Sequence, residues 1–341
     1  MNKGVVPAVW LALATCGPAF AQQPAAPAPA PAKPATAVDM GVLDIQVALD
    51  RAGFSPGVID GKPGKSLKAA LNGFQAARGL KVTGTLDEPT RLALLPDGRP
   101  PATRELTIGE DEAAGPFTDP LPDDPAEQAK LPQLGYRNLI EKLAEKFHTT
   151  PETLIAINAP KAAIGAGAKL VFPNVLPSSR DYKPELPEAW RATLSALNVD
   201  ANQPKGKRIV VDKSEEVLKV YDEADKLIAQ FPATMGSGHD PLPIGNWTVK
   251  GAAYNPPFHY NPKLFWDADD SEEKQKLPPG PNGPVGVVWL DLSKPHYGIH
   301  GTPEPSKIGR TESHGCIRLT NWDAARLAMI ISPGTPAKFQ N

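Results

Sequence analysis

The sequence predicts a multidomain chain with a small all-α unit at residues 39–96, a small α+β unit at 133–175 and a mostly-β unit at 207–340. Three observations favour this division. The chain has 341 residues, enough for two or three domains. Its 40 prolines gather in patches between segments with regular apolar patterns. Its net charge of −2 and hydrophobic content of 41% are typical of globular domains and do not indicate a nucleic-acid binder.

Residues 1–21 have the pattern of a secretory signal peptide: Lys3, a short apolar run, and the cleavage signal Ala-Phe-Ala. The run is too short to span a bilayer, and no later stretch approaches the roughly 18 apolar residues of a transmembrane helix. We therefore expect cleavage after Ala21 and no transmembrane segment in the mature chain. The alternative is a lipoprotein acylated at Cys16.

The first unit follows a Pro/Ala linker at 22–38 and has the pattern of three helices. Leu67, Leu71 and Phe74 share one face of the second helix, and "DEPTRLALL" predicts a short third helix. Asp60-Gly61 marks the turn between the first two helices.

A set of turn and core residues in this unit resembles the pattern of the peptidoglycan-binding domain 1 family. These residues are Asp60-Gly61, Gly64, Ala70, Phe74-Gln75, Gly79-Leu80, Gly84 and Thr90. The resemblance implies attachment to the cell wall but does not say which reaction takes place there. The alternative is a generic three-helix domain.

Residues 97–132 are acidic and proline-rich, and we expect an exposed linker there. The second unit, 133–175, predicts helix, turn, helix and a short strand, with His148 exposed at a helix end. Its "IEKLAEKFHTTPETLIAINAP…GAKLVFP" resembles a degenerate LysM domain, a glycan-binding module. The family's opening strand is not visible before Tyr136, so a plain helical spacer is the alternative.

The third unit follows a Pro-rich linker at 176–206 and consists mainly of strand-like runs. These runs begin at Ile209, Val217 and Leu227 and continue in "GNWTVKGAAY", "VGVVWLDL" and "HYGIHG". One helical pattern, "NWDAARLAMII", follows near the end.

The stretch "ESHGCIRL" contains Cys316, the lone thiol once Cys16 is removed. A lone cysteine in an exported protein is an intermolecular partner or a reactive thiol. A free thiol has a pKa of about 8.5, so it needs a histidine to take its proton or to hold the thiolate as an ion pair. His314 is two residues away, and on a strand both side chains would face the same side. His300 ends a preceding strand and is the second candidate.

The segment "YGIHGTPEPSKIGRTESHGCIRLTN" resembles the active-site signature of the L,D-transpeptidase family with a YkuD-type catalytic domain. His300 is followed by twelve residues and then by Ser313-His314-Gly315-Cys316. The resemblance, to the Gram-negative branch, implies that Cys316 is the nucleophile, His300 the proton donor and acceptor, and His314 a supporting residue.

Further roles follow from this resemblance. Gly315 allows close backbone approach, and the N–H groups of Gly315 and Cys316 are candidate oxyanion donors. Ser313 and Gly301 are assigned to the same oxyanion and substrate region. Arg318 could hold a substrate carboxylate bidentately or serve equally as a structural ion-pair partner.

The implied reaction is acyl transfer without a cofactor or metal. The thiol attacks the L-centre–D-Ala bond of a tetrapeptide stem, and the thioester passes the acyl group to an amine, giving a 3-3 cross-link or attaching an outer-membrane lipoprotein. The resemblance implies a periplasmic monomer that binds peptidoglycan stem peptides and glycan and acts in peptidoglycan biosynthesis, cell-wall organisation and cell shape.

Several alternatives stay open. Water as acceptor would make an L,D-carboxypeptidase, and an inactive site would leave a catalytically silent wall-binding protein. His300, His314 and Cys316 could instead bind zinc, since imidazole and thiolate both suit that metal, although no short ligand pair supports it. A papain-like peptidase would place its cysteine before its histidine in the chain.

Overall fold

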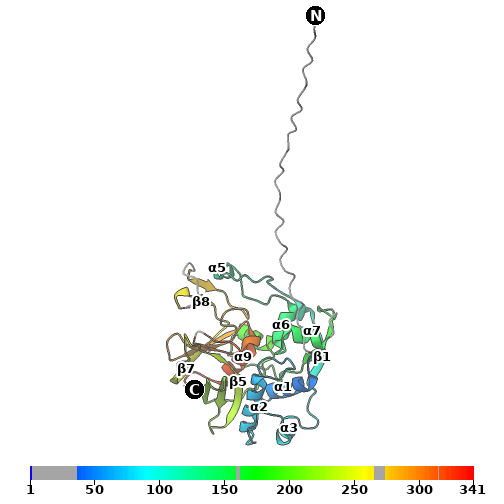
Figure 1. Ribbon diagram of the computed structural model, residues 1–341, viewed down its shortest axis with the longest axis vertical. Helices are drawn as coiled ribbons and strands as arrows, with labels where there is room; N and C mark the ends of the chain where they lie inside the picture. The colour runs from blue at the N-terminus through cyan, green and yellow to red at the C-terminus, as the bar shows by residue number, and fades with distance from the viewer. Residues whose placement is uncertain (2–36, 159–161, 265–272, 314) are drawn as a thin grey trace. The chain divides into compact units, whose positions relative to one another are not determined.

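The computed structural model describes Met1 and residues 37–158, 162–264, 273–313 and 315–341 (Figure 1). The expected signal peptide, Cys16 and almost all of the first linker lie outside the described residues. No helix within the described ranges is long and apolar enough to cross a membrane.

The first unit folds as the three expected helices, α1 (Met40–Arg51), α2 (Lys65–Ala77) and α3 (Glu88–Leu94). Several residues of the peptidoglycan-binding motif are bound by the side chain of Gln75, which is buried at the turn that joins α2 to α3. Its Nε2 donates to Thr90 Oγ1 at 2.8 Å, and its Oε1 accepts from Gly84 N at 2.9 Å. Fixing the turn in this way needs an amide at this position, because an amide donates and accepts at once.

The second unit contains α6 (Leu139–Lys146), α7 (Pro151–Ile157) and β2 (Lys169–Pro173). Its opening strand is β1 (Thr103–Thr107), which pairs antiparallel with β2 and is followed by the short helices α4 (Glu110–Ala113) and α5 (Pro125–Gln128). The expectation of a structureless linker at 97–132 is therefore wrong for β1. The run Thr-Arg-Glu-Leu-Thr has one large apolar residue, so its strand character comes from pairing with β2 rather than from its own pattern.

The third unit is mostly β, as expected. Within the described residues, nine strands form one sheet in the order β5-β4-β3-β13-β7-β10-β11-β12-β6. Their bounds are β3 Arg208–Asp212, β4 Val217–Tyr221, β5 Leu227–Pro232, β6 Thr234–Met235, β7 Gly245–Tyr254, β10 Val288–Leu292, β11 Gly298–His300, β12 Ile317–Arg318 and β13 Pro336–Gln340. A separate hairpin pairs β8 (Phe258–Tyr260) with β9 (Gln275–Leu277). The expected helix is α9 (Asn321–Ile330).

Residues 176–206 were expected to form a linker, but they contain α8 (Glu188–Ala196). Trp190 and Leu194 of this helix are completely buried in the core of the third unit. The sequence did not predict α8, because prolines flank this nine-residue helix and its apolar positions are too few to give a clear helical period.

The three units share their hydrophobic cores. Leu43 and Val47 of α1 pack with Leu143, Phe147 and Phe172 of the second unit. Other residues of the first unit, with Phe54 and Phe74 at the centre, pack against Leu227 of β5. Figure 1 shows α2, in blue, beside β5. The units are therefore not separately packed domains on flexible linkers, since each contributes apolar surface that another unit buries.

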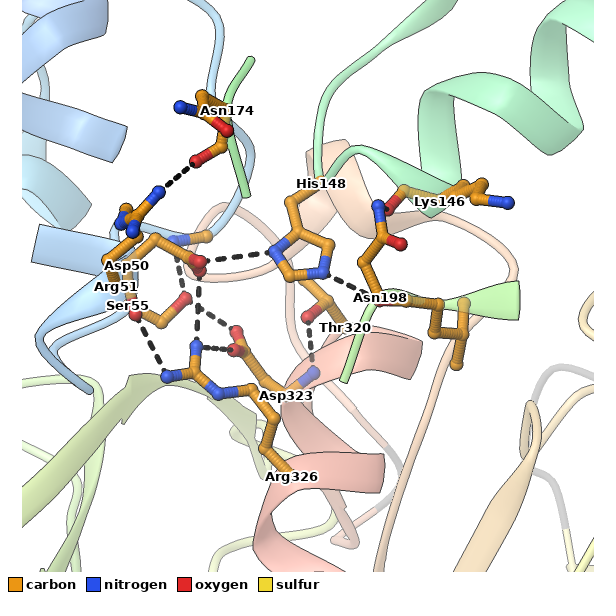
Figure 2. Close-up of polar contacts among 12 residues, drawn as sticks. Asp50, Arg51, Ser55, Lys146, His148, Asn174, Asn198, Thr320, Asp323 and Arg326 are labelled. Carbon is orange, nitrogen blue, oxygen red and sulfur yellow. Dashed lines mark hydrogen bonds and ion pairs between the residues drawn. The ribbon is translucent and has the colours of Figure 1, made fainter. Parts of the chain in front are cut away.

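A buried polar network joins the three units at α9 (Figure 2). Asp50 of α1 accepts from Arg326 Nη1 at 3.1 Å and contacts His148 Nδ1 at 3.3 Å. His148 follows α6, and its ring stacks on Trp322 of α9 with centroids 5.0 Å apart. Asp323 accepts from Ser55 of the first unit at 2.7 Å. His148 is only 2% exposed, so the expectation of a surface histidine is wrong: a contact from a distant segment buries it.

Candidate active site

The two candidate catalytic residues lie at neighbouring strands of the sheet. Strand β11 ends at His300, as expected, and pairs in parallel with β12, His300 opposite Arg318. Cys316 lies in a bend directly before β12 and not on the strand itself. Extending the register places Cys316 beside Gly298, whose backbone hydrogen-bonds the thiol. The thiol therefore lies beside β11, next to a residue two positions before His300 on that strand.

His300 is held as a neutral imidazole of one tautomer. Its Nδ1 lies 2.7 Å from Gly301 O, and a carbonyl oxygen can only accept, so Nδ1 carries the hydrogen and Nε2 keeps the lone pair. The ring stacks on Trp289 and is 4% exposed. Burial, assisted by the positive charge of Arg318, lowers the pKa of His300 to about 4. The imidazole is therefore neutral at pH 7, with Nε2 unprotonated.

Cys316 is half-buried, and its thiol donates to His296 O at 3.8 Å. Burial raises the pKa of the Cys316 thiol, although the Gly298 backbone and Arg318 oppose this effect. A protonated thiol and a neutral imidazole together favour general-base activation over a preformed thiolate–imidazolium pair.

The residues around the thiol have distinct positions. Gly315 has φ +92°, and a Cβ there would lie 2.8 Å from Tyr297 Cε1, so this position requires glycine. Ser313 is 3% exposed; its Oγ donates to Cys316 O at 2.6 Å and accepts from Gly236 N at 2.7 Å. Ser313 thus fixes the loop before the cysteine. The other histidine candidate, His314, lies outside the described residues.

The segment between His300 and Cys316 borders both N-terminal units. Residues 305–310 and 56–67 line a cavity of about 350 Å³. Residues 303–306 and 136–152 line another, of about 250 Å³. The active-site segment is therefore flanked by the first and the second unit.

Sequence reasoning assigned no role to three residues that support this site. Trp289, before the motif, stacks on His300, and Tyr297, the first residue of the motif, lies against the Gly315 position. Asn321, the last residue of the motif, packs behind Gly301. No spacing rule selects them, because their relation to the motif depends on strand order.

No group of three or more His, Cys, Asp or Glu side chains that could hold a metal occurs in the part of the chain that the structure describes. The zinc alternative included His314, which lies outside those residues.

A thiol directly before β12 and a neutral imidazole at the end of the adjacent strand β11 define, as a class, a candidate cysteine-dependent enzyme. Residues 206–338 match the family model described as the L,D-transpeptidase catalytic domain, YkuD. Residues 39–94 match the model described as "Putative peptidoglycan binding domain". The chain is therefore a transpeptidase enzyme with an L,D-transpeptidase catalytic domain and an N-terminal peptidoglycan-binding domain.

Individual relatives carry the same names. The chain is 29% identical over 199 residues to "Putative L,D-transpeptidase YkuD" of Bacillus licheniformis, which covers 58% of this chain and 90% of the relative. It is 30% identical over 135 residues to "Probable L,D-transpeptidase YbiS" of Escherichia coli, covering 38% of this chain and 44% of the relative. A solved L,D-transpeptidase from Mycobacterium smegmatis is 23% identical, with a TM-score of 0.32, covering 39% of this chain and 58% of that one.

Proposed function

We propose that the chain remodels peptidoglycan by L,D-transpeptidation through a thioester on Cys316. The observation that carries the proposal is the β11–β12 pairing, which supports a position of Cys316 beside the strand that ends at a neutral His300. The catalytic-domain match supplies the reaction class, and the peptidoglycan-binding match supports peptidoglycan as the substrate.

The first half-reaction forms the acyl-enzyme. Nε2 of His300 accepts the thiol proton as Cys316 Sγ attacks the carbonyl carbon of the third, L-configured centre of a tetrapeptide stem. The N–H groups of Gly315 and Cys316 stabilise the oxyanion, a contribution typically of about 10²–10³ in rate per donor. The C–N bond breaks, His300 gives its proton to the departing D-alanine amine, and a thioester remains.

The second half-reaction releases the product. An acceptor amine attacks the thioester carbonyl and loses a proton to His300, and collapse of the tetrahedral intermediate returns the proton to the Cys316 sulfur. An amine from a second stem gives a 3-3 cross-link, and an amine of an outer-membrane lipoprotein gives attachment of that protein. Water in place of the amine gives L,D-carboxypeptidase activity.

The N-terminal units are proposed to hold the enzyme on its substrate. In the second unit β1 pairs antiparallel with β2, the short helices α4 and α5 follow β1, and α6 and α7 precede β2. The pair α6–α7 with this two-stranded sheet supports a LysM-like glycan-binding module. A protein that acts on peptidoglycan works outside the cytoplasmic membrane, and the pattern of residues 1–21 favours the periplasm.

The test is incubation with a disaccharide-tetrapeptide muropeptide, followed by mass spectrometry. The wild type is expected to form a cross-linked dimer that has lost one D-alanine, whereas Cys316→Ala and His300→Gln are expected to form none. His259→Gln, in the separate β8–β9 hairpin, is the matched control and should retain activity. Formation of the tripeptide without any cross-linked dimer would contradict transpeptidation and support the L,D-carboxypeptidase alternative. No product, even with a lipoprotein acceptor added, together with no carbapenem adduct on Cys316, would refute the proposal.

A further inference from the structure

We propose that Glu145, a residue outside the catalytic domain, acts through Asn321 as a positioning residue for His300. The inference rests on the proposed function, in which His300 carries the proton. It concerns three contacts in series, from α6 of the second unit, through the first residue of α9, to the end of β11.

The last contact in the series, between Gly301 O and His300 Nδ1, fixes the tautomer of the imidazole. Gly301 O accepts the Nδ1 hydrogen of His300, so the position of this carbonyl determines which ring nitrogen is free to take a proton. A Cβ on Gly301 would lie 2.0 Å from Asn321 Oδ1. The Asn321 amide therefore packs directly against the Gly301 backbone and limits where its carbonyl can lie.

The Asn321 side chain has a single orientation. It is completely buried, its Oδ1 accepts from Val287 N at 3.2 Å, and its Nδ2 donates to Glu145 Oε1 at 2.7 Å and to Pro281 O at 3.0 Å. An amide rotated by 180° would set its NH₂ against the Val287 N–H and its oxygen against two acceptors. The shortest of these bonds is the one to Glu145.

Glu145 is itself fixed by its surroundings. It is 7% exposed; its Oε1 accepts from Asn321 Nδ2, and its Oε2 has no hydrogen-bond partner among the described residues. Burial raises the pKa of Glu145 to about 7, although the neighbouring Tyr136 hydroxyl and the Asn321 amide oppose the rise. A buried carboxyl is costly unless it is hydrogen-bonded, so the position of Glu145 depends on the bond to Asn321.

The consequence is that the second unit is part of the active-site support. If the acceptor at Glu145 moves away, the Asn321 amide loses its shortest bond and keeps only the longer ones to Pro281 O and Val287 N, so it can shift and hold Gly301 O less firmly opposite Nδ1. His300 can then populate the other tautomer, in which Nε2 carries the hydrogen and cannot accept a proton from the thiol.

The experiment separates the effect of side-chain length at Glu145 from the effect of its charge. Glu145→Asp keeps the carboxyl but retracts it by one methylene, whereas Glu145→Gln keeps an oxygen acceptor at full length. Glu152→Gln, an exposed carboxylate of the same unit, is the matched control. Two measurements are made on each variant. The ¹⁵N chemical shifts of the His300 ring report the tautomer, and steady-state kinetics on the muropeptide give kcat and KM.

The expected result is a wild-type tautomer and wild-type kcat for Glu145→Gln and for the control. For Glu145→Asp we expect mixed ring signals and a kcat lowered about tenfold to a hundredfold with KM unchanged. Ring signals and kcat that stay at wild-type values in Glu145→Asp would overturn the inference. If that variant does not fold, Asn321→Ala applies the same test, and an unchanged tautomer there would overturn it too. The ring shifts decide the matter even if the wild type forms no cross-linked product, so failure of the proposed function is distinguishable.

Discussion

Replacing Asp50 with alanine tests whether the buried network holds the three units together. The carboxylate is 4% exposed and serves both Arg326 and His148. Burial alone would raise the pKa of Asp50, but His148 and Arg326 outweigh it, and the pKa lies below its usual 3.8. Asp50→Ala leaves the Arg326 guanidinium, itself 8% exposed, with the Asp50 carbonyl and the more distant Asp323 carboxylate as acceptors.

Removing one partner of a buried ion pair costs about 3–5 kcal/mol of unfolding free energy, because the remaining charge stays buried. The unit Ala37–Asn341 unfolds with an entropy of roughly 0.6 kcal/mol/K at the usual value per residue. The loss therefore corresponds to a Tm lowered by about 5–8 °C. Since the folded pKa lies below 3.8, the stabilising contribution is present above pH 3.8 and is lost as the pH falls further.

The assay is urea denaturation and calorimetry at pH 7. The matched control is Asp44→Ala, which removes a carboxylate from the same helix but from a partly exposed pair with Arg99. A loss of about 1 kcal/mol or less is expected there. If Asp50→Ala destabilised the protein no more than Asp44→Ala does, the network would not be what joins the units, and the reasoning would be refuted.

Two further predictions concern the active site. The kcat/KM of the wild type should fall on the acid side of its pH profile near pH 4 rather than 6.5, because the pKa of His300 is lowered to about 4. Arg318→Gln should move this acid limb of the profile to higher pH, because the charge of Arg318 helps to lower that pKa. A wild-type acid limb at pH 6.5 would contradict the buried neutral imidazole. Gly315→Ala should lower kcat by about tenfold or more, because φ +92° and the contact with Tyr297 force the backbone beside Cys316 to move; full activity in steady-state kinetics would show that this loop tolerates the shift.

Local sequence patterns were sufficient for much of the fold. The periodicity of Leu67, Leu71 and Phe74 predicted α2, and the alternating runs from Ile209 onward predicted β3, β4 and β5. These predictions are confirmed, because the periods of helices and strands can be recognised from the apolar residues of one short segment. The resemblance to the L,D-transpeptidase signature selected Cys316 and His300; the structure places His300 at the end of β11 and Cys316 in a bend directly before the neighbouring strand β12.

Interactions between distant segments were not visible in the same way. Strand β1 becomes a strand only beside β2, and α8 is recognised only through the core that buries Trp190. His148 was expected at the surface because a single histidine at a helix end has no pattern, and only the approach of Asp50 and α9 buries it.

The sequence by itself determined most of the helices and strands and the motif with its class of chemistry, because these depend on residue type and short spacing, whereas β1 and α8 needed the tertiary structure. The tertiary structure alone decided the protonation state of His300, since burial and the charge of Arg318 on the adjacent strand lower its pKa to about 4. It also decided that Glu145 and Asn321 stand behind Gly301. A side chain's environment is made by the segments packed around it, and in this chain those segments come from all three units.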